Sequence, residues 1–148
     1  MALLKDSIQF ASSHNFWQHR ADALNTLSFV YLEQGHTEEA DALAREVLGL
    51  VEPSLVTRGL IADACWVLGI SRAEAYPEEA ALLIDAGDAE RKRSGAFEHQ
   101  RLTRIREGAV ARIALASHDG HGPGRVEARS TPSLEEARSL ALHLLERT

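Results

Sequence analysis

The chain has 148 residues, of which 45% are hydrophobic and 26% charged. This balance excludes global disorder, and the length favours one domain with a single core. A net charge of -6 disfavours unaided binding to nucleic acids or to an anionic membrane, and the single cysteine excludes a disulfide within the chain.

The first third of the chain predicts three helices. Apolar residues at helical spacing indicate a short helix from Leu3 to Ala11 and a clearer one from Phe16 to Gly35, where the pattern stops. Thr37 is then expected to cap a third helix, which ends near Leu50. Two glutamates follow Thr37, where the positive end of a helix favours carboxylates.

Two more helices follow in the middle of the chain. The dipeptide Pro53-Ser54 marks a break after the third helix, and an apolar stripe then predicts a helix from Leu55 to about Arg72. The next helix is expected to begin at Pro77, because proline suits the first helical position, and to end with a basic stretch before Gly95.

The last part of the chain predicts a terminal helix pair, residues 97–117 and 133–147. The two helices are joined by a glycine-rich segment, 118–131, which we expect to be a flexible loop. Ser133 and Glu136 have the spacing of a capping box at the start of the last helix. The fold class is therefore all-α, with six to seven helices and no strand pattern.

A repeated motif gives this helical chain an expected architecture. Helix starts recur as Thr37-Glu38-Glu39-Ala40, Pro77-Glu78-Glu79-Ala80 and Leu134-Glu135-Glu136-Ala137. The first unit also contains Leu24-x2-Leu27-Ser28-x2-Tyr31 with Gly35, Ala40 and Pro53. This spacing of large and small residues resembles the tetratricopeptide repeat (TPR), in which two antiparallel helices pack closely. The resemblance implies a single domain over 1–148, an antiparallel helix-hairpin array with its best repeat at 21–54 and a degenerate one at 56–93.

A second resemblance covers the later half of the chain. The run from Ala75 to Arg91, the arginine-rich helix after Gly95 and the closing leucine-rich helix are similar to the C-terminal TPR region of actinobacterial LuxR-type and SARP-type regulators. In those regulators this region serves as a sensor or scaffold arm, and the ATPase and DNA-binding parts lie elsewhere. Neither a phosphate-binding G-x-x-x-x-G-K-[ST] loop nor a recognition helix is found in this sequence.

A TPR register laid on the first repeat predicts the residues that face a partner. It directs Asp22, Asn25, Phe29 and Glu33 toward the concave face of the array. Trp17 is an additional candidate anchor if it lies on the surface.

No residue set in the sequence indicates catalysis or a bound metal. His118-x-x-His121 has ligand-like spacing, but the flanking glycines favour solvated loop histidines over a metal site. Cys65 lies in an apolar run, where burial would raise the pKa of a thiol and make it unreactive. The Glu-Glu pairs are interpreted as helix-start signals, because neighbouring helix residues point about 100° apart.

We therefore expect a non-catalytic protein-interaction or regulatory scaffold module, without a cofactor and located in the cytoplasm. The alternative is a helical domain that senses a small-molecule effector in a closed apolar pocket. A protein or peptide partner is expected, without nucleic acid or membrane binding, and self-association through the exposed ends of the array is possible.

Overall fold

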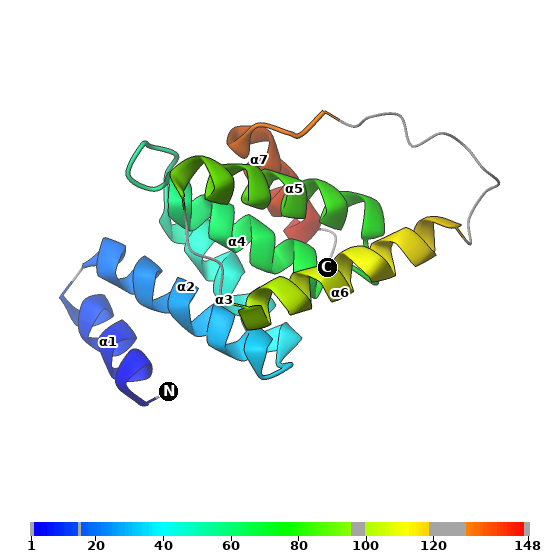
Figure 1. Cartoon of the computed structure of the whole chain (residues 1–148). Helices are drawn as coiled ribbons and strands as arrows, with labels where there is room; N and C mark the ends of the chain where they lie inside the picture. Colours follow the sequence, from blue (N-terminus) through cyan, green and yellow to red (C-terminus); the bar gives the residue numbers. More distant parts are fainter. Residues whose placement is uncertain (1, 15, 96–99, 119–129, 147–148) are drawn as a thin grey trace.

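The computed structural model describes residues 2–14, 16–95, 100–118 and 130–146 (Figure 1). Within these ranges the chain forms seven helices and no strands, which confirms the all-α fold class. The helices are α1 (Ala2–Ser13), α2 (Trp17–Glu33), α3 (Thr37–Leu50), α4 (Arg58–Ser71), α5 (Pro77–Ser94), α6 (Gln100–His118) and α7 (Leu134–Glu146).

The first five helices pack in chain order, each against the next (Figure 1). Helix α2 also contacts α4, so α4 lies against both helices of the α2–α3 pair. Helix α1, in contrast, contacts α2 and no other helix among the described residues. One side of α1 therefore has no helix against it.

Helix α4 is the centre of the core. It contacts α2, α3, α5, α6 and α7, and its residues from Ala64 to Ile70 are all buried. Because the residues on every side of this helix are apolar or small, it can be surrounded by other helices on all sides. Trp66 is its largest buried side chain and is fully shielded from solvent.

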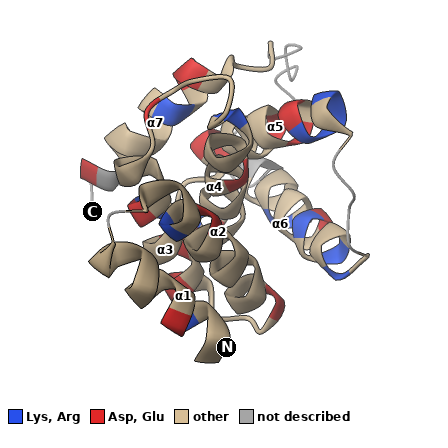
Figure 2. Ribbon diagram, turned by 90° about the vertical axis from the view of Figure 1, so that its left-hand side faces the viewer, with Lys and Arg blue, Asp and Glu red and all other residues tan. Residues whose placement is uncertain are grey.

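The expected terminal helix pair does not form. Among the described residues α6 packs on α2, α4 and α5, whereas α7 packs on α3, α4 and α5 and does not contact α6. Figure 2 shows the two helices on different sides of α4.

Polar contacts explain where α7 lies. Arg138 donates to the Leu48 and Val51 carbonyl oxygens at 3.3 and 3.1 Å, and Arg72 donates to the Leu144 carbonyl at 3.3 Å. These bonds hold α7 against the end of α3 and against α4. They join residues more than 70 positions apart, so the local pattern of the sequence did not reveal them.

Several predicted helix ends are confirmed. Gly35 and Gly95 have φ angles of 78° and 67°, in the left-handed region that glycine adopts without strain. Pro77 occupies the first position of α5. The capping box forms as expected, because the Ser133 amide donates to Glu136 at 2.7 Å and the Glu136 amide donates to the Ser133 hydroxyl at 3.2 Å.

Two predicted helix starts are wrong. Thr37 is the first residue of α3 and not its cap, and the capping position is held by His36 without a side-chain hydrogen bond. Helix α4 begins at Arg58 and not at Leu55, because the Thr57 hydroxyl bonds to the Ser54 hydroxyl and to the Glu52 carbonyl and so holds a turn. Leu55, predicted to lie on an apolar helix face, is 89% exposed.

The expected flexible loop lies largely outside the described residues, which exclude 119–129. The N-terminal side of the first terminal helix is also outside them up to residue 99, and His118 is the last residue of α6. Residues 130–133 lead into α7 without regular structure.

Candidate functional site

The four residues predicted to face a partner lie along α2 but have different environments. Asp22 is exposed, whereas Asn25 is buried and Phe29 and Glu33 are half-buried. The predicted face of α2 is therefore not one continuous exposed surface. Each residue must be considered with the elements that it contacts.

Asn25 belongs to a polar cluster inside the protein. Its side-chain amide donates to Asp63 of α4 at 3.0 Å, and Asp63 also accepts a hydrogen bond from Arg91 of α5 at 2.6 Å. The pKa of Asp63 is raised because the effect of burial exceeds the opposite effects of Arg91 and Asn25. Asn25 thus connects α2 to a buried ion pair and is not displayed to a partner.

Phe29 packs against the same ion pair. The Arg91 guanidinium lies 5.7 Å from the centre of the Phe29 ring and 5.2 Å from that of Trp66, and the two rings meet edge to face at 5.9 Å. Trp66 in turn donates its indole N–H to Asp88 at 2.9 Å, and Arg106 of α6 donates to Asp88 at 2.8 Å. The cluster links four helices, and its charged groups neutralise one another.

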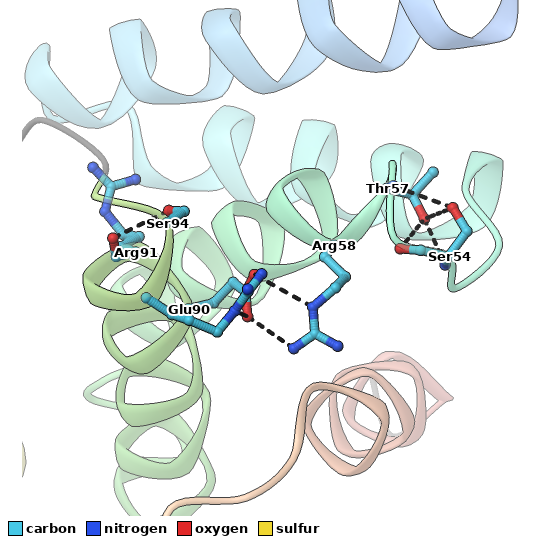
Figure 3. A network of polar contacts seen from close by, with 7 residues as sticks. Ser54, Thr57, Arg58, Glu90, Arg91 and Ser94 are labelled. Carbon is cyan, nitrogen blue, oxygen red and sulfur yellow. Dashed lines mark hydrogen bonds and ion pairs between the residues drawn. The ribbon is translucent and has the colours of Figure 1, made fainter.

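A second ion cluster joins the start of α4 to the end of α5 (Figure 3). Glu90, only 6% exposed, accepts hydrogen bonds from Arg58 at 2.9 Å and from Arg93 at 3.0 Å. Hydrogen bonds from Arg93 and Arg58 lower the pKa of Glu90 to about 2. Its carboxylate is therefore ionised and fully paired, and cannot act as a general base near neutral pH.

The described thiol and the possible metal ligands are not arranged for catalysis or metal binding either. Cys65 is fully buried as expected, and burial raises the pKa of its thiol to about 12. Within the described ranges no three His, Cys, Asp or Glu side chains converge as metal ligands would. His121 of the predicted ligand-like pair lies outside those ranges.

A groove with a volume of about 700 Å³ lies between α1 and α2. Its apolar side chains include Leu3, Phe10 and Phe16, which are 81%, 58% and 49% exposed. Its other lining residues are Leu4, Asp6, Ser7, Ala11, His19, Asp22, Ala23 and Thr26. Large apolar side chains are thus concentrated on one accessible surface, as is typical of interaction sites.

Aromatic contacts order one end of this groove. The Phe10 ring stacks on His14 at 4.2 Å, His14 lies 6.0 Å from Phe16, and Phe16 lies 5.8 Å from His19. Rings held by their neighbours lose little rotational freedom when a partner covers them. Trp17, the anchor candidate from the sequence, follows this cluster and is 42% exposed.

The charge in the groove is acidic. Asp6 from α1 and Asp22 from α2 both line it, and neither carboxylate has an ion-pair partner among the described residues. No lysine or arginine belongs to the lining that the structure describes. Asp22 is therefore the one predicted residue that faces an open site, although it does so beside α1 and not across a concave face.

A smaller cavity, about 210 Å³, lies between the start of α4 and the start of α7. Arg58 and Arg138 both line it, together with Glu135. Their guanidinium groups are already bonded to Glu90 and to the carbonyls at the end of α3. Arg58 is thus paired with a carboxylate, whereas among the described residues Arg138 donates only to carbonyl oxygens and its buried Nε has no hydrogen-bond partner.

Sequence reasoning missed the α1 side of the groove. Helical periodicity predicted a helix from Leu3 to Ala11, but it did not indicate which of its apolar residues would be exposed. Leu3 and Phe10 are exposed because α2 is the only described helix that contacts α1. The available signal was the presence of apolar residues on two sides of a short helix: Leu4 and Ile8 are half-buried, whereas Leu3 and Phe10 are exposed.

Comparisons of the chain with protein-family models, curated proteins and solved structures find no match. Over the described residues, no helix has both the length and the apolar character needed to cross a bilayer.

Proposed function

We propose that the protein is a non-catalytic protein-interaction module that binds its partner through the groove between α1 and α2. The observation that supports this most directly is the combination of exposed Leu3, Phe10 and Phe16 in one groove of about 700 Å³. Covering a large exposed apolar side chain contributes about 1.5–3 kcal/mol. Three such anchors together contribute at most about 4.5–9 kcal/mol, against an association cost of about 4–15 kcal/mol, so the remaining contacts of the groove must contribute to the affinity as well.

The ion clusters support a non-catalytic role. The half-buried Asp63 and the buried Glu90 are each paired with arginines, and Cys65 is buried with a raised thiol pKa. A catalytic site needs a titratable group within reach of substrate, with its charge or proton available. In this chain the ion pairs hold helices together, and the accessible groove between α1 and α2 is apolar and acidic. A regulatory role within a larger signalling system rests on the resemblance in sequence alone.

A photo-cross-linking experiment with matched positions tests the proposal. A photoreactive residue at position 10 samples the groove, and one at position 55 samples an apolar position in the α3–α4 turn that is more exposed than Phe10 and lies outside the groove. We expect specific adducts from cell extract at position 10, lost on Phe16→Ser, and no shared adduct at position 55. Equal labelling at both positions, or adducts at position 10 that persist in Phe16→Ser, would contradict a groove-specific role.

A further inference from the structure

We infer that the occupant of the α1–α2 groove is a basic amphipathic α-helix of a partner protein. This inference rests on the proposed function, since it names the chemistry of the partner for the same groove. Its apolar stripe would cover Leu3, Phe10 and Phe16, and its lysine or arginine side chains would meet Asp6 and Asp22.

The packing inside the molecule supports a helical occupant. Helix α4 lies against both α2 and α3, so the groove of one antiparallel helix pair is already filled by a third helix. The α1–α2 pair has the same construction, and no helix fills its groove among the described residues. Helix α1 has 12 residues, which at 1.5 Å a residue gives a groove about 18 Å long. A helix of about three turns matches this length.

An extended peptide is a poorer fit, because the backbone amides and carbonyls of α1 and α2 are bonded within their own helices. They cannot form the main-chain hydrogen bonds on which strand addition depends. A helix satisfies its own backbone and presents side chains at i, i+3, i+4 and i+7 to an apolar groove. The groove therefore favours a partner whose backbone amides and carbonyls are already hydrogen-bonded to one another, as they are in a helix.

The charges of the groove select the sign of the partner. Asp6 and Asp22 lie on opposite helices of the groove, and neither is neutralised by a neighbouring cation among the described residues. An acidic helix would be repelled from both walls, whereas lysine or arginine on both flanks of the apolar stripe would be attracted. The carboxylates thus discriminate between helices that are equally apolar.

A second copy of this chain is a weaker candidate for the groove. Two copies that met groove to groove would bring four unpaired aspartates together. Helix α6 carries arginines and exposes Val110 and Leu115, but these two lie five positions apart and hence about 140° apart around the helix. They do not form the continuous stripe that the groove requires, and this favours a partner of different sequence.

Synthetic peptides test the inference on the full chain. The first is a fluorescent 14-residue helix with leucines at i, i+3, i+7 and i+10 and lysines on both flanks. The others replace its lysines by glutamate, replace them by glutamine, or scramble its sequence. Anisotropy is measured at low and high salt, with circular dichroism to verify that each protein variant is folded.

We expect the basic helix to bind at least about tenfold more tightly than the acidic one, and more weakly at high salt. An exposed ion pair is worth a factor of about 1.4 to 5 in affinity, so Asp6→Asn with Asp22→Asn should weaken the basic helix about twofold to twenty-fivefold. The matched control, Glu38→Gln with Glu107→Gln, removes two exposed charges outside the groove and should leave affinity unchanged. Phe10→Ser should abolish binding.

The outcomes separate this inference from the proposed function. If the glutamine peptide binds as tightly as the basic one and Phe10→Ser abolishes both, the groove is an interaction site but its selection of basic helices is overturned. Equal binding of the scrambled basic peptide overturns the helical occupant. If no peptide binds while position 10 still gives specific cross-links, only the partner chemistry is wrong. Self-association of the wild type that is lost in Phe10→Ser would assign the groove to a second copy.

Discussion

Replacing Gly87 by alanine would place a methyl group directly between the two most closely packed helices. A Cβ atom at this position of α5 would lie 2.7 Å from the Trp66 Cβ, 2.9 Å from its Cδ1 and 3.1 Å from the Ala62 carbonyl oxygen. The shortest of these contacts is about 1 Å below the optimal separation of two carbon atoms. Ala62 O and Trp66 Cβ are fixed to the α4 backbone, so neither can move without moving the helix.

The expected cost follows from two opposing effects. Alanine is favoured over glycine within a helix by about 1 kcal/mol. Forcing a methyl group into a closely packed interface typically costs about 1–3 kcal/mol, and here the separation of α4 from α5 also disturbs the Trp66–Asp88 hydrogen bond of 2.9 Å. Set against the gain in helix propensity, this cost means that Gly87→Ala should lower the free energy of unfolding by up to about 2 kcal/mol and Tm by up to about 8 °C.

Urea denaturation followed by circular dichroism measures this change, and Gly108→Ala is its matched control. Gly108 lies inside α6, where an added Cβ would meet only the mobile Arg112 Nη1, at an ordinary 3.6 Å. That variant should be more stable than the wild type by about 0.5–1 kcal/mol, because only helix propensity changes. If Gly87→Ala were as stable as Gly108→Ala, the close approach of α4 and α5 would be refuted.

Two further predictions concern the buried ion clusters. Arg91→Met leaves the half-buried Asp63 without its cation, so we expect a loss of up to about 3 kcal/mol at pH 7 that diminishes in acid as Asp63 takes up a proton. A loss independent of pH in urea titrations would contradict this. The pKa of Glu90 is lowered from 4.5 to about 2, so its contribution to stability is complete above pH 4.5 and is lost as the pH falls toward 2. Glu90→Gln should therefore be less stable than the wild type at pH 7, and the urea midpoints of the two proteins should converge near pH 2. A difference between the midpoints that stays constant with pH would show that the ion pairs of Glu90 do not cause the loss of stability.

The helices and many of their ends could be predicted because the forces that define them are local. The φ angle of Gly95, the position of Pro77 and the Ser133–Glu136 capping box each depend on residues within one turn of the helix end. The start of α4 was wrong because Thr57 bonds to the turn before it, which hydrophobic spacing does not record. Local signals therefore specified which segments are helical, and side-chain hydrogen bonds shifted individual boundaries.

The packing partners of each helix were less accessible to sequence reasoning. Helix α7 was expected beside α6, but Arg138 and Arg72 hold it to the opposite side of α4 through carbonyls far away in sequence. Asn25 was expected on an open face, yet it lies against Asp63, whose charge is balanced by Arg91 from another helix. The sequence indicated which residues of α2 share a face, but it could not identify which helix packs against that face.

The groove between α1 and α2 connects this packing to function. Helix α1 has 12 residues and, among the described helices, contacts only α2; isolated helices of that length are marginally stable in water. A partner helix that covers Phe10 and Leu3 would bury surface on both walls of the groove, and so would stabilise α1 in the position where it completes the site. The exposed face of α1 thus leaves this helix with few stabilising contacts and also provides the apolar surface for binding. The affinity of the groove for a partner therefore depends on the free energy needed to hold α1 against α2.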